Sequence, residues 1–100
     1  MPSGSDLQID GPYASVWDAI EPDPVERERL KLLSQLSIQL ELHIREKGWS
    51  QRQAAMHLGV TQPRISDLVR GRLDLFSVDA LLALLWRAGV QVDVTLHNAA

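Results

Sequence analysis

The sequence predicts a mainly α-helical domain, a compact helix-turn-helix bundle of about four to five helices followed by one C-terminal β-strand. Three observations lead to this fold class. Helix-capping residues precede several stretches in which apolar residues recur at helical spacing. Glycines follow these stretches at the points where helices end. After residue 89, apolar and polar residues alternate strictly, which is the pattern of a half-buried strand.

The N-terminal part of the chain is divided into a tail and a short helical turn. Residues 1–12 are rich in Ser, Gly, Pro and Asp, and we expect them to form a flexible tail. Ser15 then caps a predicted turn that carries Trp17 and Ile20 on one side. These two side chains either cover the next helix or anchor a partner protein, since tryptophan is favoured at binding hot spots.

A long helix is predicted to begin after Asp23, a typical N-cap, and to run from Pro24 to Lys47 and stop at Gly48. At 1.5 Å per residue it is ~36 Å long, so its first turns should project beyond the core. Apolar residues cover nearly all sides of this helix, which therefore needs more than one partner surface. They form one stripe, Leu33, Leu36, Leu40 and Ile44, and a wider set, Leu30, Leu32, Ile38 and Leu42.

Two short helices joined by a tight turn are predicted next. Ser50 opens the first with a capping box, and Thr61 is the expected N-cap of the second. Gly59 permits the positive φ of a tight turn, and the small Ala55 lets the two helices approach closely. This spacing over residues 50–71 is typical of a helix-turn-helix.

The exposed face of the second short helix is predicted to contact double-stranded DNA. Ile65 and Leu68 would hold the helix on the core and leave polar side chains outside. Glutamine and arginine suit bidentate hydrogen bonds to adenine and guanine edges, so this face is interpreted as a base-reading surface. Its polar residues are Gln62, Ser66, Asp67 and Arg70, with Arg64 at its edge. The alternative is two ordinary amphipathic helices joined by a glycine.

The charges are distributed unevenly along the chain. Its formal net charge is −3, yet residues 44–72 hold six basic residues against two acidic ones. Residues 1–43 hold eight acidic residues against three basic ones. A local basic footprint on an acidic body can attract phosphate and leave the remaining surface for another partner. The six basic residues are Arg45, Lys47, Arg52, Arg64, Arg70 and Arg72.

A last helix and a strand complete the predicted fold. Ser77 caps the helix, in which Leu81, Leu82, Leu84, Leu85 and Trp86 are expected to be buried. The strand covers residues 90–97, and residues 13–17 offer it only a poor partner within the chain. Since an isolated strand cannot satisfy its backbone hydrogen bonds, we expect it to pair with the same strand of a second protomer. The apolar face of this predicted dimer interface consists of Val90, Val92, Val94 and Leu96.

Several classes of protein are disfavoured by what the sequence lacks. A chain of 100 residues allows one domain, which we place at residues 13–97. There is no cysteine, hence no disulfide or thiolate metal site, and no catalytic, phosphate-binding or metal-binding motif is present. We therefore expect no enzyme, no cofactor and no metal. A signal peptide and a membrane span are also missing, which predicts a cytoplasmic protein.

The chain from Ser15 to Leu96 resembles the Xre-type helix-turn-helix regulators and, within them, the HigA-like antitoxins of type II toxin–antitoxin modules. The helix-turn-helix motif is shared with many phage-type repressors and implies only the fold and DNA binding. Its combination with Phe76, Ser77 and the terminal strand is narrower. The resemblance is carried by Ser15–Ala19, the long helix around Leu33 to Arg45, Gly48–Ala55, Leu58–Ser66, Arg70–Leu73, Phe76–Ser77 and Gly89–Val92.

The resemblance implies a cytoplasmic antitoxin that binds a small basic ribonuclease toxin of RelE-like fold and, as a homodimer, represses its own promoter. It places Gln51 and Arg52 at the DNA backbone. It places Gln62, Arg64 and Ser66 at the bases, while Arg70 is expected to contact mainly phosphate. Two alternatives remain: a stand-alone Xre-type repressor without a toxin partner, and a pure protein-interaction module.

Overall fold

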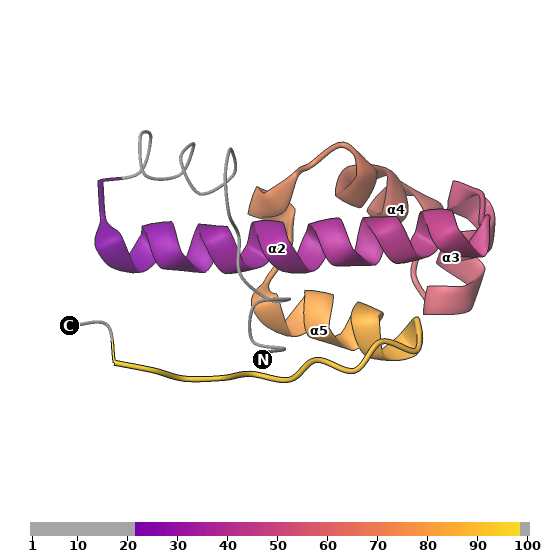
Figure 1. The fold of residues 1–100 in the computed structure, drawn as a ribbon. Coiled ribbons are helices and arrows are strands. Elements are labelled where there is room, and N and C mark those ends of the chain that lie inside the picture. Colours follow the sequence, from indigo (N-terminus) through magenta and orange to yellow (C-terminus); the bar gives the residue numbers. More distant parts are fainter. Residues whose placement is uncertain (1–21, 99–100) are drawn as a thin grey trace.

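The computed structural model describes residues 22–98, which form four α-helices and one short 3-10 helix (Figure 1). This mainly helical architecture agrees with the predicted fold class. The predicted tail, Trp17 and Ile20 lie outside the described residues. The elements are α2 (Pro24–Lys47), α3 (Gln51–Leu58), α4 (Gln62–Val69), η2 (Leu73–Leu75) and α5 (Val78–Arg87).

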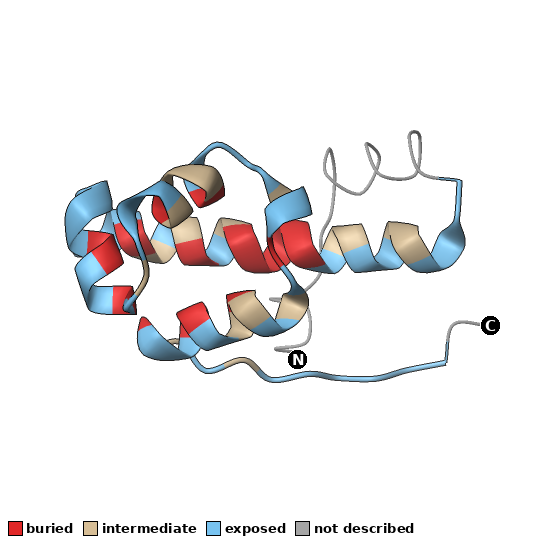
Figure 2. Ribbon diagram, turned by 180° about the vertical axis from the view of Figure 1, so that it is seen from behind, coloured by how far each residue is buried: buried red, intermediate tan, exposed pale blue. Residues whose placement is uncertain are grey.

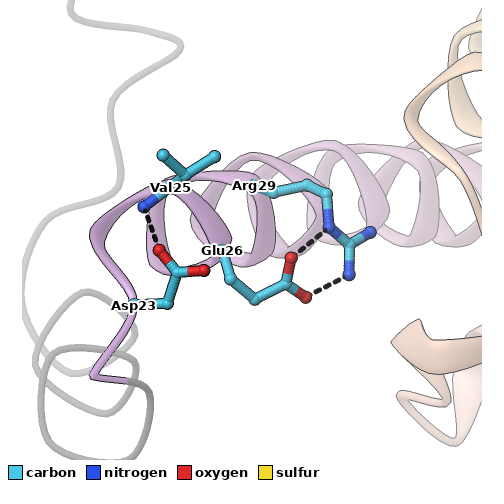
Figure 3. Close-up of polar contacts among 4 residues, drawn as sticks. All are labelled: Asp23, Val25, Glu26 and Arg29. Carbon is cyan, nitrogen blue, oxygen red and sulfur yellow. Dashed lines mark hydrogen bonds and ion pairs between the residues drawn. The ribbon is translucent and has the colours of Figure 1, made fainter.

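Helix α2 has the predicted bounds because the residue next to each end favours a helix terminus there. The Asp23 carboxylate accepts a hydrogen bond from the backbone N–H of Val25 at 3.0 Å (Figure 3). Within the first turns, Glu26 accepts two hydrogen bonds from the guanidinium of Arg29 (Figure 3). These bonds lower the pKa of Glu26 and raise the pKa of Arg29. Gly48 ends the helix in the left-handed conformation, with φ 71°.

One face of α2 forms the spine of the hydrophobic core. Its predicted stripe is buried, and α5 packs along it (Figure 2). The first turns of α2 extend beyond α3, α4 and α5, as its length predicted (Figure 1). On the other faces, Leu32 and Leu42 are 41% and 45% exposed. The described helices therefore cover only part of the apolar surface of α2.

Helices α3 and α4 pack on each other through small and branched side chains, and α4 also packs on α2 and α3 on α5. The close approach rests on Ala54 and Ala55, which are buried at the centre of the cluster. Ile65 and Leu68 hold α4 on the core, as predicted. The other residues of α4 are half-buried or exposed (Figure 2).

Helix α5 differs from expectation at Trp86, which is 74% exposed instead of buried. The reason is helical geometry. Leu81, Leu84 and Ala88 recur at helical spacing and take the face toward the core. Trp86 falls on the other side of the helix, next to Leu82. Although apolar residues occur on most sides of α5, only the side that faces the core is buried.

The C-terminal segment follows α5 without helix or strand, and no β-strand is assigned within residues 22–98. The backbone N–H of Val90 closes α5 by donating to the carbonyl of Leu85 at 2.9 Å. Val90 and Val92 pack against the core, whereas Val94 and Leu96 are 74% and 87% exposed. Within residues 22–98, this segment has no strand to pair with. Strand formation across a dimer stays a prediction.

Candidate nucleic-acid interface

The start of α3 has the predicted capping box. The Ser50 hydroxyl accepts a hydrogen bond from the backbone N–H of Gln53 at 3.1 Å. The Gln53 side-chain oxygen accepts one from the backbone N–H of Ser50 at 2.9 Å. Thr61 occupies the predicted N-cap of α4, although its side chain makes no capping hydrogen bond. Gln51 and Arg52, in the first turn of α3, are exposed as a DNA backbone contact requires.

The turn between α3 and α4 is held by a residue from outside the motif. Gly59 has φ 70°, the left-handed conformation for which glycine is suited. The guanidinium of Arg87, in the last turn of α5, donates a hydrogen bond to the carbonyl oxygen of Leu58 at 3.1 Å. A cation is favourable at this position because the C-terminal end of α3 carries partial negative charge. The sequence analysis did not predict this role of Arg87, because the residue lies 29 positions after Leu58 and no local pattern connects the two.

The side of the motif before the turn is stiffened by an aromatic stack. The rings of Trp49 and His57 lie 4.2 Å apart, centroid to centroid, at an angle of 9°. Trp49 also packs against the core. The stack joins the residue before the N-cap of α3 to the last turn of the same helix.

The predicted base-reading residues of α4 differ in exposure. Gln62 and Arg70 are exposed, whereas Ser66 and Asp67 are half-buried. Arg64 is half-buried because it lies one turn before Leu68, at the border of the buried stripe.

Arg64 makes two contacts with the segment after α4. One of its terminal guanidinium nitrogens, Nη1, donates to the carbonyl oxygen of Leu75 at 2.6 Å. Its Cζ lies 4.0 Å from the centroid of the Phe76 ring, within the range of a cation–π interaction. The side chain thus connects the first turn of α4 to the end of η2.

The basic residues of the predicted footprint differ in how their charge is used. Arg45 pairs with Glu41 at 3.6 Å, and Arg72 pairs with Asp74 at 3.5 Å. Within residues 22–98, Arg52 and Arg70 form no ion pair. Their charge is therefore available for phosphate, as is that of Lys47, which forms no ion pair in that range either.

The N-terminal ends of α3 and α4 lack acidic residues in their first turns. By contrast, α2 and α5 have Glu26 and Asp79 at the corresponding places. Helix N-termini attract anions through their free backbone N–H groups and the helix dipole. The two helices of the turn therefore leave their positive ends open to phosphate, whereas the flanking helices do not.

The sequence profile of the family described as "Helix-turn-helix domain" matches residues 20–97. The chain belongs to the helix-turn-helix domain family. No curated protein matches the sequence. Membership supports a DNA-binding regulator as the broad function, and α3 and α4 are the two helices of its motif.

Other kinds of site find little support in the described part of this helix-turn-helix protein. Between residues 22 and 98, no three His, Cys, Asp or Glu side chains gather as a metal site. None of the helices described there has both the length and the apolarity needed to cross a bilayer.

A second surface of the helix-turn-helix protein lies on α5, away from the motif. A shallow groove of ≈ 430 Å³ is lined by side chains of α5 and the C-terminal segment, which are Leu82, Trp86, Val90, Gln91 and Val92. Two of the four predicted dimer residues, Val90 and Val92, belong to this groove. The other two, Val94 and Leu96, continue from it along the exposed segment.

Proposed function

We propose that this protein is a sequence-specific DNA-binding repressor that acts as a homodimer and also serves as the antitoxin of a small basic ribonuclease toxin of RelE-like fold. The DNA part is carried by one observation. The helix-turn-helix exposes polar side chains on α4, leaves Arg52 and Arg70 without an ion pair within residues 22–98, and has no acidic residue in the first turn of α3 or α4.

In this proposal, the residues of the motif have separate roles. Gln62 and Ser66 read base edges in the major groove, with Arg64 beside them. Gln51, Arg52 and Arg70 bind the phosphate backbone and thereby fix the position of α4 on the duplex.

The proposed dimer is supported by the groove on α5 and by the extended segment after it. An exposed tryptophan at the edge of an apolar groove is typical of an interface core. The backbone groups of residues 91–98 make no hydrogen bond to backbone of the described chain, so they are available for an antiparallel partner. A two-fold axis at Asp93 would place two carboxylates opposite each other. An axis at Val94 instead places Val92 opposite Leu96 of the partner, which favours this register.

The proposed toxin surface is the N-terminal part of the chain. The resemblance to HigA-like antitoxins supports it, together with the exposed Leu32 and Leu42 on the outer faces of α2. Trp17 and Ile20 would be apolar anchors. Acidic residues would form the rim toward a basic partner, and these are Glu21, Asp23, Glu26 and Glu28.

A selection experiment tests DNA recognition. Duplexes are selected from a randomised library with the wild-type protein, and affinity is measured for a selected duplex and for its scrambled sequence. We expect a preference of about 10³-fold or more. Gln62→Ala should reduce the preference, whereas Gln39→Ala, an exposed glutamine of α2, should not. A failure to enrich any sequence would contradict base recognition.

Co-expression tests the antitoxin role. The product of a neighbouring short gene for a basic protein should arrest growth when expressed alone. It should co-purify with this protein and become harmless when both are expressed. If the neighbour is harmless by itself or does not co-purify, the protein is a stand-alone repressor.

A further inference from the structure

Arg64 occupies a position that is electrostatically unfavourable for a cation. It is the third residue of α4, in the first turn, where the helix dipole presents its positive end. The side chain is nevertheless ordered by a hydrogen bond to the Leu75 carbonyl and by the face of Phe76. Two independent contacts therefore fix a guanidinium at the end of the helix that approaches DNA in the proposed function.

Both partners of this guanidinium are uncharged. A carbonyl oxygen and an aromatic ring orient the group but do not cancel its charge. Arg45 and Arg72 differ in this respect, because each pairs with a carboxylate. In the described chain, the side chain of Arg64 has no ion pair and no hydrogen bond other than the one to Leu75. It is thus held in place while its charge and most of its N–H donors stay available.

We propose that Phe76 is a positioning residue for DNA recognition, because it orients the guanidinium of Arg64 before DNA binds. Phe76 is 5% exposed, so it does not itself reach DNA. An arginine loses much rotamer freedom when it contacts a base, and prior orientation reduces that loss. This inference rests on the proposed DNA-binding function and adds a buried residue to its determinants of sequence preference.

The test is a double-mutant cycle on a duplex selected with the wild-type protein. Phe76→Leu keeps an apolar side chain in the core but removes the ring. We expect the affinity for the selected duplex to fall about 2- to 10-fold, as for the loss of one pre-ordered side chain. Affinity for scrambled DNA should stay unchanged. In an Arg64→Ala background, Phe76→Leu should cause no further loss of affinity.

Two controls separate positioning from general loss of structure. Leu85→Val alters a buried residue of α5 that takes part in neither Arg64 contact, and it should leave DNA affinity unchanged. Arg64→Lys keeps the charge but not the planar donor group, so it should lose preference for the selected duplex and retain binding to scrambled DNA. Melting temperatures identify the range in which every variant is folded.

The outcomes distinguish this inference from the function on which it rests. If wild-type protein selects no sequence, the proposed function fails. If selection succeeds but the losses from Phe76→Leu and Arg64→Ala multiply in the double variant, only the positioning role is overturned. Equal losses on selected and scrambled DNA for Phe76→Leu would also overturn it, because they would indicate a purely structural contact.

Discussion

The arginines of the described chain show how one residue type serves different purposes. Arg45 and Arg72 form surface ion pairs, which contribute little to stability. Arg64 and Arg87 donate to backbone carbonyls of other elements. Arg52 keeps its charge free within residues 22–98. Only a free or merely oriented arginine can contribute its full charge to binding a polyanion.

Arg52→Ala should weaken binding to every DNA sequence by a similar factor. The residue stands in the first turn of α3 and is proposed to contact phosphate, which carries no sequence information. The slope of log affinity against log salt concentration should fall by about one unit. Titrations at several salt concentrations measure this slope. Arg72→Ala is the matched control, and its effect should be smaller because Asp74 already pairs with that arginine. A loss confined to the selected duplex would contradict a phosphate contact.

Polar contacts between neighbours in sequence were predictable, whereas those between distant residues were not. The capping box of Ser50 and Gln53 spans three residues, so the pattern of residue types reveals it. The bond from Arg64 spans 11 residues and the bond from Arg87 spans 29. Such contacts depend on how α4, η2 and α5 pack together. Residue types alone indicate neither partner.

At the scale of elements, the ends of the helices could be predicted from the sequence more reliably than the burial of single side chains. The ends of α2 were predicted correctly because Asp23 and Gly48 act on the adjacent backbone. Trp86 was placed wrongly because α5 is apolar on most sides, and composition cannot show which side meets α2. The last segment alternates apolar and polar residues as a strand does, yet residues 91–98 form neither helix nor strand in the structure. Alternation fixes which side chains share a face but not which chain would supply the hydrogen-bonding partner.

Arg87→Ala should destabilise the protein through the turn between α3 and α4. It removes the donor that satisfies the Leu58 carbonyl and the cation that complements the end of α3. We expect a loss of about 1 kcal/mol in the free energy of unfolding, measured by urea denaturation. Asp79→Ala, an exposed change at the other end of α5, is the control and should have a smaller effect. An unchanged midpoint for Arg87→Ala would show that water replaces the guanidinium without cost.

Val94→Asp combined with Leu96→Asp should produce a folded monomer. Both side chains are exposed in the single chain, so the substitutions spare the core, but they bring like charges together in the proposed strand pair. Sedimentation should show the loss of dimer, and affinity for a two-fold operator should fall. Thr95→Lys, on the alternate face of the segment, should leave the dimer intact. A doubly substituted protein that remains dimeric would place the interface elsewhere.

At the scale of the whole molecule, α2 connects the helix-turn-helix motif to most of the described residues of the proposed toxin surface. The structure measures 43 × 30 × 21 Å, and α2 spans much of its long dimension (Figure 1). The motif follows the C-terminal end of α2. Asp23, Glu26, Glu28 and Leu32 of the proposed toxin surface lie in or before its N-terminal half, whereas Leu42 lies nearer the motif. Charge is divided in the same way, with basic residues near the motif and acidic residues before it.

This separation predicts that the two functions can be removed independently. Gln62→Ala combined with Arg64→Ala should abolish promoter binding and still protect cells from the neighbouring toxin. Trp17→Ala combined with Ile20→Ala should weaken protection and leave promoter binding intact. A reporter fused to the promoter measures the first function, and growth during toxin expression measures the second. If either pair of substitutions removes both functions, the surfaces are not separate.

The exposure of Trp86 also means that intrinsic tryptophan fluorescence can report on self-association. An indole in water emits at longer wavelength than one enclosed by protein, and Trp86 is 74% exposed beside the groove on α5. With Trp17 and Trp49 replaced by phenylalanine, all remaining tryptophan fluorescence would come from this position. Its emission would shift to shorter wavelength as the groove becomes covered, so self-association could be followed without a label, at concentrations too low for sedimentation.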